Sequence, residues 1–173
     1  MPLLYVAVGQ RLGYPIAMVH VPDHGFARYV DPHFPNGNIE ATSGGKRFFD
    51  HEYIEKHGVN AKALQSGAYM RPLSLREHLG MLITANAFLH ALHKDVAKCL
   101  DYLKASLLLA PRRAETYEQI AAGYEYYSKL SSGAESKAYA AQAKATMQKA
   151  LDLGYVRIED VRKNRNTEGL VGR

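Results

Sequence analysis

The chain has 173 residues, of which 47% are hydrophobic, with a formal net charge of +5 and a single cysteine. This length suits one compact domain or two small ones. No apolar run approaches the ~18 residues that cross a bilayer, and the first residues lack the basic stretch of a secretory signal. One cysteine excludes an internal disulfide framework. We therefore expect a cytoplasmic protein with no membrane partner.

The positive charge is spread along the chain. Residues 1–70 carry six basic and six acidic side chains, residues 71–156 carry eleven and eight, and residues 157–173 carry five and three. Nucleic-acid binding calls for Lys and Arg clustered on one face, ideally interleaved with aromatic side chains. This distribution argues against a nucleic-acid partner.

Residues 1–70 carry alternating helix and strand signals. A turn-rich segment at 31–37 predicts a hairpin loop between two of the strands, so neighbouring strands are expected to run antiparallel. In chain order, the sequence predicts a helix at 3–12, strands at 16–21, 25–30 and 38–42, a helix at 48–56, and a short helix or loop at 58–70.

Three polar residues lie where the second and third of these strands are expected to pair. His24 stands at the start of one strand, while Asn38 and Glu40 are two apart on the next and so share a face. An imidazole held by an amide or carboxylate is the base and orienter of a Cys-His-Asn/Asp triad. The alternative is a surface or capping histidine, with the other two on the exposed face of a strand.

Residues 71–156 predict two helical hairpins, with turns near 93–95 and 131–133. The expected helices are 75–92, a second that ends at Leu109, 114–130 and 134–153. Small residues are expected where the paired helices touch, namely Ala87, Cys99, Ser106, Ala121, Ala143 and Ala150.

The spacing within these hairpins resembles the tetratricopeptide repeat. Tyr117-x2-Ile120-Ala121-x2-Tyr124 matches the first helix of that ~34-residue pattern, and Ala143-x3-Met147 matches the second. About ten extra residues between Tyr124 and Ala143 predict a longer second hairpin. Two repeats cannot bury their end faces alone, so we expect residues 1–70 to pack on one end. The resemblance implies a protein or peptide partner on the repeat surface, and the exposed ends are candidates for homo-oligomer contacts.

A second resemblance concerns the N-terminal segment. Residues 4–15, LYVAVGQRLGYP, resemble the helix-to-strand segment of transglutaminase-like domains of the papain-like superfamily, as in bacterial proteins where such a domain precedes tetratricopeptide repeats. His24, in HGFARY, matches the family's catalytic histidine motif. The stretch NIEAT at 38–42 matches the third motif, with Glu40 where many relatives carry aspartate. The resemblance implies His24 as the catalytic histidine and Glu40 as its orienter, with Asn38 as the alternative.

The family's nucleophile is a cysteine at the N-terminus of the first helix, where the helix dipole favours a thiolate. Here that position falls just before Met1, so the sequence as written is not expected to perform cysteine acyl transfer. Either the chain is shortened at its start, or it is a relative that has lost its nucleophile. Cys99, in the helical half, is interpreted as a packing residue.

Together these patterns predict an α+β fold: a small transglutaminase-like segment of helix and antiparallel sheet at 1–70, packed on an all-α tetratricopeptide-type array at 71–156, with a basic tail at 157–173. The expected function is a transglutaminase-like, cysteine-dependent acyl transferase or peptide/amide hydrolase, inactive as it stands and fused to a protein-binding array. The alternative is a non-catalytic protein–protein interaction scaffold. No cofactor is expected. No metal is expected either, because neither HExxH nor zinc-ligand spacing occurs.

Overall fold

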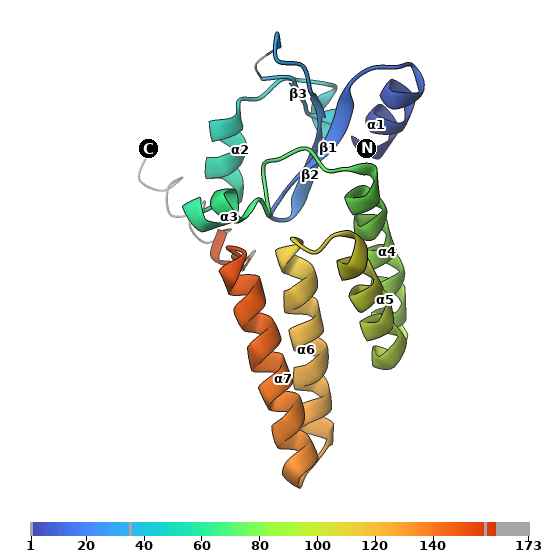
Figure 1. Cartoon of the computed structure of the whole chain (residues 1–173), viewed down its shortest axis with the longest axis vertical. Helices are drawn as coiled ribbons and strands as arrows, with labels where there is room; N and C mark the ends of the chain where they lie inside the picture. Colours follow the sequence, from blue (N-terminus) through green and yellow to red (C-terminus); the bar gives the residue numbers. More distant parts are fainter. Residues whose placement is uncertain (1, 35, 158, 162–173) are drawn as a thin grey trace. The chain divides into compact units, whose positions relative to one another are not determined.

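The computed structural model describes residues 2–34, 36–157 and 159–161, and it has the expected α+β composition (Figure 1). The chain divides into two compact units. The first takes Met1–Ser74 together with the segment that starts at Val156, and the second takes Leu75–Tyr155. Most of the predicted tail at 157–173 lies outside the described residues. Val161, which is described, is buried and lies against Gly58 of the first unit.

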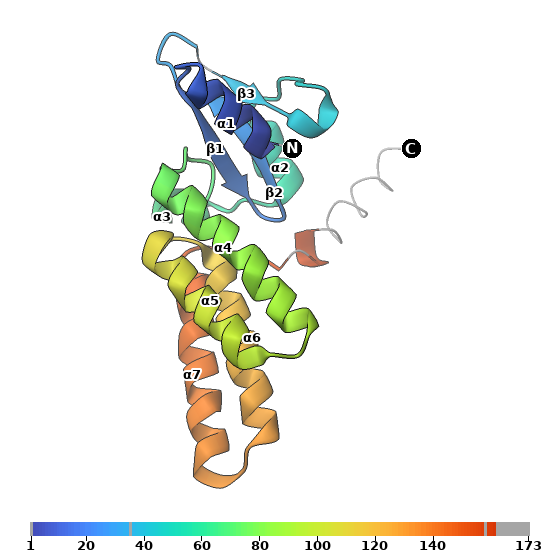
Figure 2. The same cartoon turned by 90° about the vertical axis from the view of Figure 1, so that its right-hand side faces the viewer.

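The first unit is built on a three-stranded antiparallel sheet with the order β1-β2-β3. In both Figure 1 and Figure 2, helices α1 and α2 lie on opposite faces of this sheet. Val19, Val21 and Phe26 are completely buried within this unit. Its elements are α1 (Pro2–Arg11), β1 (Ile16–Val21), β2 (His24–Tyr29), β3 (Asn38–Ile39), the 3-10 helix η1 (Ala41–Ser43), α2 (Asp50–His57) and α3 (Ala61–Ser66).

The register of the strands decides which side chains share a face. Arg28 pairs with Asn38 across β2 and β3, and side chains alternate along each strand. His24, Arg28, Asn38 and Glu40 therefore lie on one face of the sheet, together with Phe26. The predicted common face for the polar residues is confirmed.

The third strand is shorter than predicted, because Glu40 ends it. The expected strand ran through Thr42, whereas β3 stops at Ile39. The Glu40 carboxylate accepts the backbone N–H of Thr42 and caps η1, which turns the chain. Gly44 then ends this turn in the left-handed conformation, at φ 68°.

The second unit consists of two helical hairpins, and the predicted helix boundaries are confirmed to within a residue. The unit itself begins at Leu75 rather than at the predicted residue 71. Helix α4 pairs with α5, α6 pairs with α7, and α5 lies against α6. Within the described part of the chain, none of the helices is long and apolar enough to span a membrane. The helices are α4 (Leu75–Leu92), α5 (Val96–Leu109), α6 (Ala114–Leu130) and α7 (Gly133–Asp152).

Small residues form the contacts within each hairpin. Ser106 donates from its hydroxyl to the carbonyl oxygen of Gly80 at 2.8 Å. A Cβ at Gly80 would lie 2.9 Å from both the backbone carbonyl oxygen of Ser106 and the Cβ of Ala110. Cys99 is only half-buried and packs at the edge of the core. The other five predicted contact residues are buried, as expected: Ala87, Ser106, Ala121, Ala143 and Ala150.

Candidate functional site

His24 and Glu40 form a hydrogen-bonded pair on the α2 side of the sheet. The Nε2 atom of His24 lies 2.7 Å from Oε2 of Glu40. The Glu40 side chain is 5% exposed and the His24 side chain 22%, so the carboxylate is enclosed while the imidazole reaches solvent. The predicted approach of these two residues is confirmed.

Glu40 is fixed by donors on both of its oxygens. The backbone N–H and the hydroxyl of Thr42 donate to Oε1, at 3.0 and 2.5 Å. The Tyr53 hydroxyl joins His24 on Oε2, at 3.1 Å. Burial raises the pKa of Glu40, but the hydrogen bonds from Thr42 and His24 outweigh it and lower that pKa to about 2. Glu40 is therefore a carboxylate throughout the neutral range.

The charge of Glu40 sets the tautomer of His24. A carboxylate oxygen can only accept, so Nε2 of the neutral imidazole carries the proton and Nδ1 keeps its lone pair. Among the described residues, none makes a hydrogen bond to Nδ1 of His24. A partly exposed imidazole with a fixed Nε2–H and an open Nδ1 has the form of a general base.

Asn38 has a different position from the one proposed for it as an alternative orienter. Its Oδ1 accepts Nε–H of Arg28 at 2.7 Å, and its Nδ2 donates to Oδ1 of Asp50 at 2.7 Å and to the carbonyl of Phe48 at 3.0 Å. The amide is completely buried and engaged on both ends. Glu40, not Asn38, holds the His24 ring, which corrects that alternative.

Helix α2 contributes residues that the sequence analysis missed. Tyr53 stacks on Phe26, with ring centroids 3.8 Å apart, and its hydroxyl reaches Glu40. His57 stacks on His24, with centroids 5.1 Å apart and planes 8° apart. The available signal was the spacing of Asp50, Tyr53 and His57, which places them on one face of a helix.

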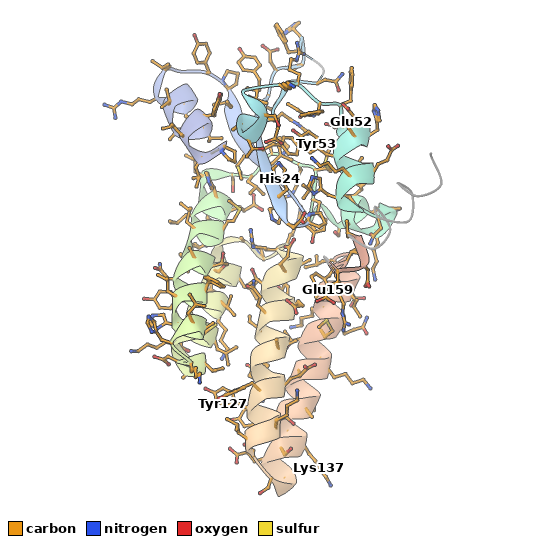
Figure 3. All side chains as sticks on the ribbon, turned by 180° about the vertical axis from the view of Figure 1, so that it is seen from behind. His24, Glu52, Tyr53, Tyr127, Lys137 and Glu159 are labelled. Atoms are coloured by element: carbon orange, nitrogen blue, oxygen red, sulfur yellow. The ribbon has the colours of Figure 1, made fainter. Side chains whose placement is uncertain are left out.

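The first turn of α1 approaches the loop that follows Glu40. The Tyr5 hydroxyl lies 3.6 Å from where a Cβ of Gly45 would be, in the loop that Glu40 opens by its bridge to Lys46. Figure 3 shows His24 and Tyr53 between α1 and α2. The helix itself packs on the opposite face of the sheet, where Gly9 meets Ile16, so a position of the His24–Glu40 pair at the N-terminal end of α1, as the resemblance implies, is not confirmed.

The cysteine of the sequence lies elsewhere, on α5 in the second unit. Burial and the nearby Asp95 raise the pKa of Cys99, so its sulfur is a thiol at neutral pH. The described residues contain no group of three or more His, Cys, Asp and Glu side chains arranged to hold a metal ion.

A second feature with the form of a binding site is an apolar groove of about 550 Å³ within the second unit. Helices α4, α5 and α6 contribute its walls, including Phe88, Val96, Leu103 and Tyr126. Grooves of this size and lining are typical of ligand or peptide sites.

The two features differ in chemistry. The first offers a histidine base with a fixed carboxylate, and the second offers an apolar surface. No family model, curated protein or solved structure matches the chain.

Proposed function

We propose that the first unit is the histidine–carboxylate part of a transglutaminase-like site for cysteine-dependent acyl transfer or for hydrolysis of a peptide or amide. The observation that carries the proposal is the 2.7 Å contact between His24 Nε2 and Glu40 Oε2, which leaves Nδ1 open. The resemblance of residues 4–15, 24–29 and 38–42 to that family supports the same roles.

The proposed roles follow from proton transfer. A thiol that precedes α1 and reaches the α2 side of the sheet would give its proton to Nδ1 of His24, and the thiolate would attack an amide carbonyl. The imidazolium, stabilised by Glu40 on Nε2, would return the proton to the leaving amine. Acyl transfer to an amine or to water then releases the thiol.

The nucleophile is the missing part of this scheme. Cys99 is the one cysteine of the 173 residues, and its raised pKa and position on α5 do not suit it for the role. We therefore propose that this chain alone is inactive and that a cysteine directly before Met1 would complete the site.

Inserting a cysteine directly before Met1, behind a new initiator methionine and in a Cys99→Ala background, tests the proposal. The pH dependence of iodoacetamide alkylation gives the pKa of the inserted thiol. We expect that pKa to lie at least one unit below the ordinary ~8.5 and to rise when His24 is also changed to Gln. An acyl-enzyme burst with an activated ester is expected only when both His24 and the inserted cysteine are present.

The matched control is Leu12→Cys in the same background. Leu12 follows α1 at its other end and is 67% exposed, so its thiol should titrate at an ordinary pKa. Identical alkylation profiles for the inserted cysteine with and without His24 would contradict the proposal.

A second candidate function, a protein-binding scaffold, is favoured by the groove between α4, α5 and α6. Its walls combine aromatic and aliphatic side chains with Lys94 and Glu118, which suits an extended or helical peptide with apolar anchors. This reading needs no nucleophile and fits the resemblance to tetratricopeptide repeats.

Peptide selection with the whole chain tests this candidate. Peptides selected from a displayed library should lose at least tenfold in affinity for Ala91→Arg, because Ala91 is exposed and lines the groove. Ala138→Arg, at an exposed position of α7 outside the groove, should bind them unchanged. Equal loss in both variants, or in neither, would remove the groove from consideration.

A further inference from the structure

The turn between β1 and β2 places a second imidazole–carboxylate pair against the first. Nδ1 of His57 lies 2.9 Å from Oδ1 of Asp23 and 3.1 Å from the carbonyl oxygen of Pro22. Both partners are acceptors, so this nitrogen carries a proton. The His57 side chain is 5% exposed, and its ring lies face to face with that of His24.

The surroundings of the two rings are mostly anionic. Each ring has a carboxylate on its own edge, which favours the imidazolium. However, the rings are stacked at 5.1 Å, so a proton on one disfavours a proton on the other. The titratable and charged groups around them are Glu40 after β3, Asp23 in the turn, Tyr53 on α2, and the Arg28–Asp50 ion pair farther along the same face.

We propose that His57 is a positioning residue for His24: held by Asp23, it fixes the His24 ring by stacking and couples its own protonation to that of His24. The catalytic consequence rests on the proposed function, since a general base must be neutral to accept a proton. The coupling itself follows from the stacked pairs alone.

Proton titration of the imidazole Cε1–H resonances by NMR, in the full 173-residue chain, tests this coupling. His24→Gln and His57→Gln each assign one resonance and remove one ring. The ring that takes up its proton second in the wild type should titrate at a higher pH once its neighbour is gone, by on the order of one pH unit. If the remaining ring keeps its wild-type midpoint in both variants, the coupling is refuted.

A control and a second variant protect the test against misfolding. His51→Gln removes an exposed imidazole from the same helix and should leave the His24 titration unchanged. Asp23→Asn keeps an acceptor for His57, and asparagine tolerates the positive φ of 57° at this position. In Asp23→Asn the His57 midpoint should fall, and an unmoved midpoint would overturn the proposal.

These titrations separate this inference from the proposed function. They require no catalysis, so a failure of the inserted cysteine to react leaves them unaffected. Conversely, His24 activating that cysteine while its own titration ignores His57 would support the proposed function and refute the coupling.

Discussion

The two units are stabilised by different kinds of contact. On one face of the first unit, polar side chains satisfy one another around a buried amide, as when Asn38 holds both Arg28 and Asp50. In the second unit, small residues bring helices together, as where Gly80 meets Ser106. The stability of a polar network depends on every hydrogen-bonding partner being present, whereas the stability of a close helix contact depends on the small volume of its side chains. The difference indicates which substitutions each unit should tolerate.

The largest effect is expected for Gly80→Val, which tests the dependence of the second unit on volume. The added side chain would meet Ser106 and Ala110 at van der Waals overlap, and overpacking of this kind costs about 3 kcal/mol. Urea unfolding followed by far-UV circular dichroism measures it. Ala85→Val, at an exposed position of the same helix, should cost only about 0.5 kcal/mol, and equal losses would argue against a close contact at Gly80.

Arg28→Met applies the corresponding test to the polar network. The guanidinium donates to Asn38, to the carbonyl of Met70 and to Asp50. Removing it takes this donor from the buried Asn38 oxygen and from the carbonyl of Met70, at a cost of about 2 kcal/mol. The same unfolding measurement applies. A neutral or stabilising result would mean that the network contributes less than apolar packing in its place.

Glu40 should make the stability of the first unit depend on pH. Its folded pKa of about 2 lies below its ordinary value of 4.5, so its contribution is present above about pH 4.5 and is lost as the pH falls toward 2. Glu40→Gln should therefore cost about 1 kcal/mol at pH 7 and almost nothing at pH 2. Urea unfolding at a series of pH values measures this difference. If the free energy of unfolding depends on pH in the same way in the variant and the wild type, Glu40 is not the source of the pH dependence.

The smallest effect is expected for Tyr53→Phe. It removes one hydroxyl from Glu40 but keeps the ring that stacks on Phe26, so stability should fall by only about 0.5 kcal/mol. Loss of this donor should also raise the pKa of Glu40. Carboxyl carbon chemical shifts followed by NMR against pH measure that change, and Tyr117→Phe, whose hydroxyl bonds Pro111 in the second unit, is the matched control.

The helical hairpins were predictable because their signals are local. Apolar spacing, the turn around Asp95 and the break before Pro111 act within a few residues, and helices α4 and α6 have the predicted bounds. The same holds for β1, whose apolar run is bounded by turn residues. The common face of His24 and Glu40 was also predictable, because side chains alternate between the two faces along a strand.

The remaining parts of the site depend on contacts distant in sequence. The Arg28 guanidinium engages Asn38 and so leaves Glu40 to hold His24. The position of that guanidinium cannot be predicted from the residues next to Asn38 or Glu40 in the sequence. His57 and Tyr53 belong to a helix whose packing on the sheet is set by tertiary contacts. The early end of β3 came from a side chain that caps its own backbone.

The double role of Glu40 has an evolutionary consequence. The same carboxylate orients His24 and caps η1, so folding retains this residue whether or not catalysis is under selection. His24, in contrast, supports no backbone turn through its side chain. In a lineage that loses acyl transfer, substitutions should therefore accumulate at His24 before they accumulate at Glu40, and the order of loss among relatives would record when selection for the chemistry ended.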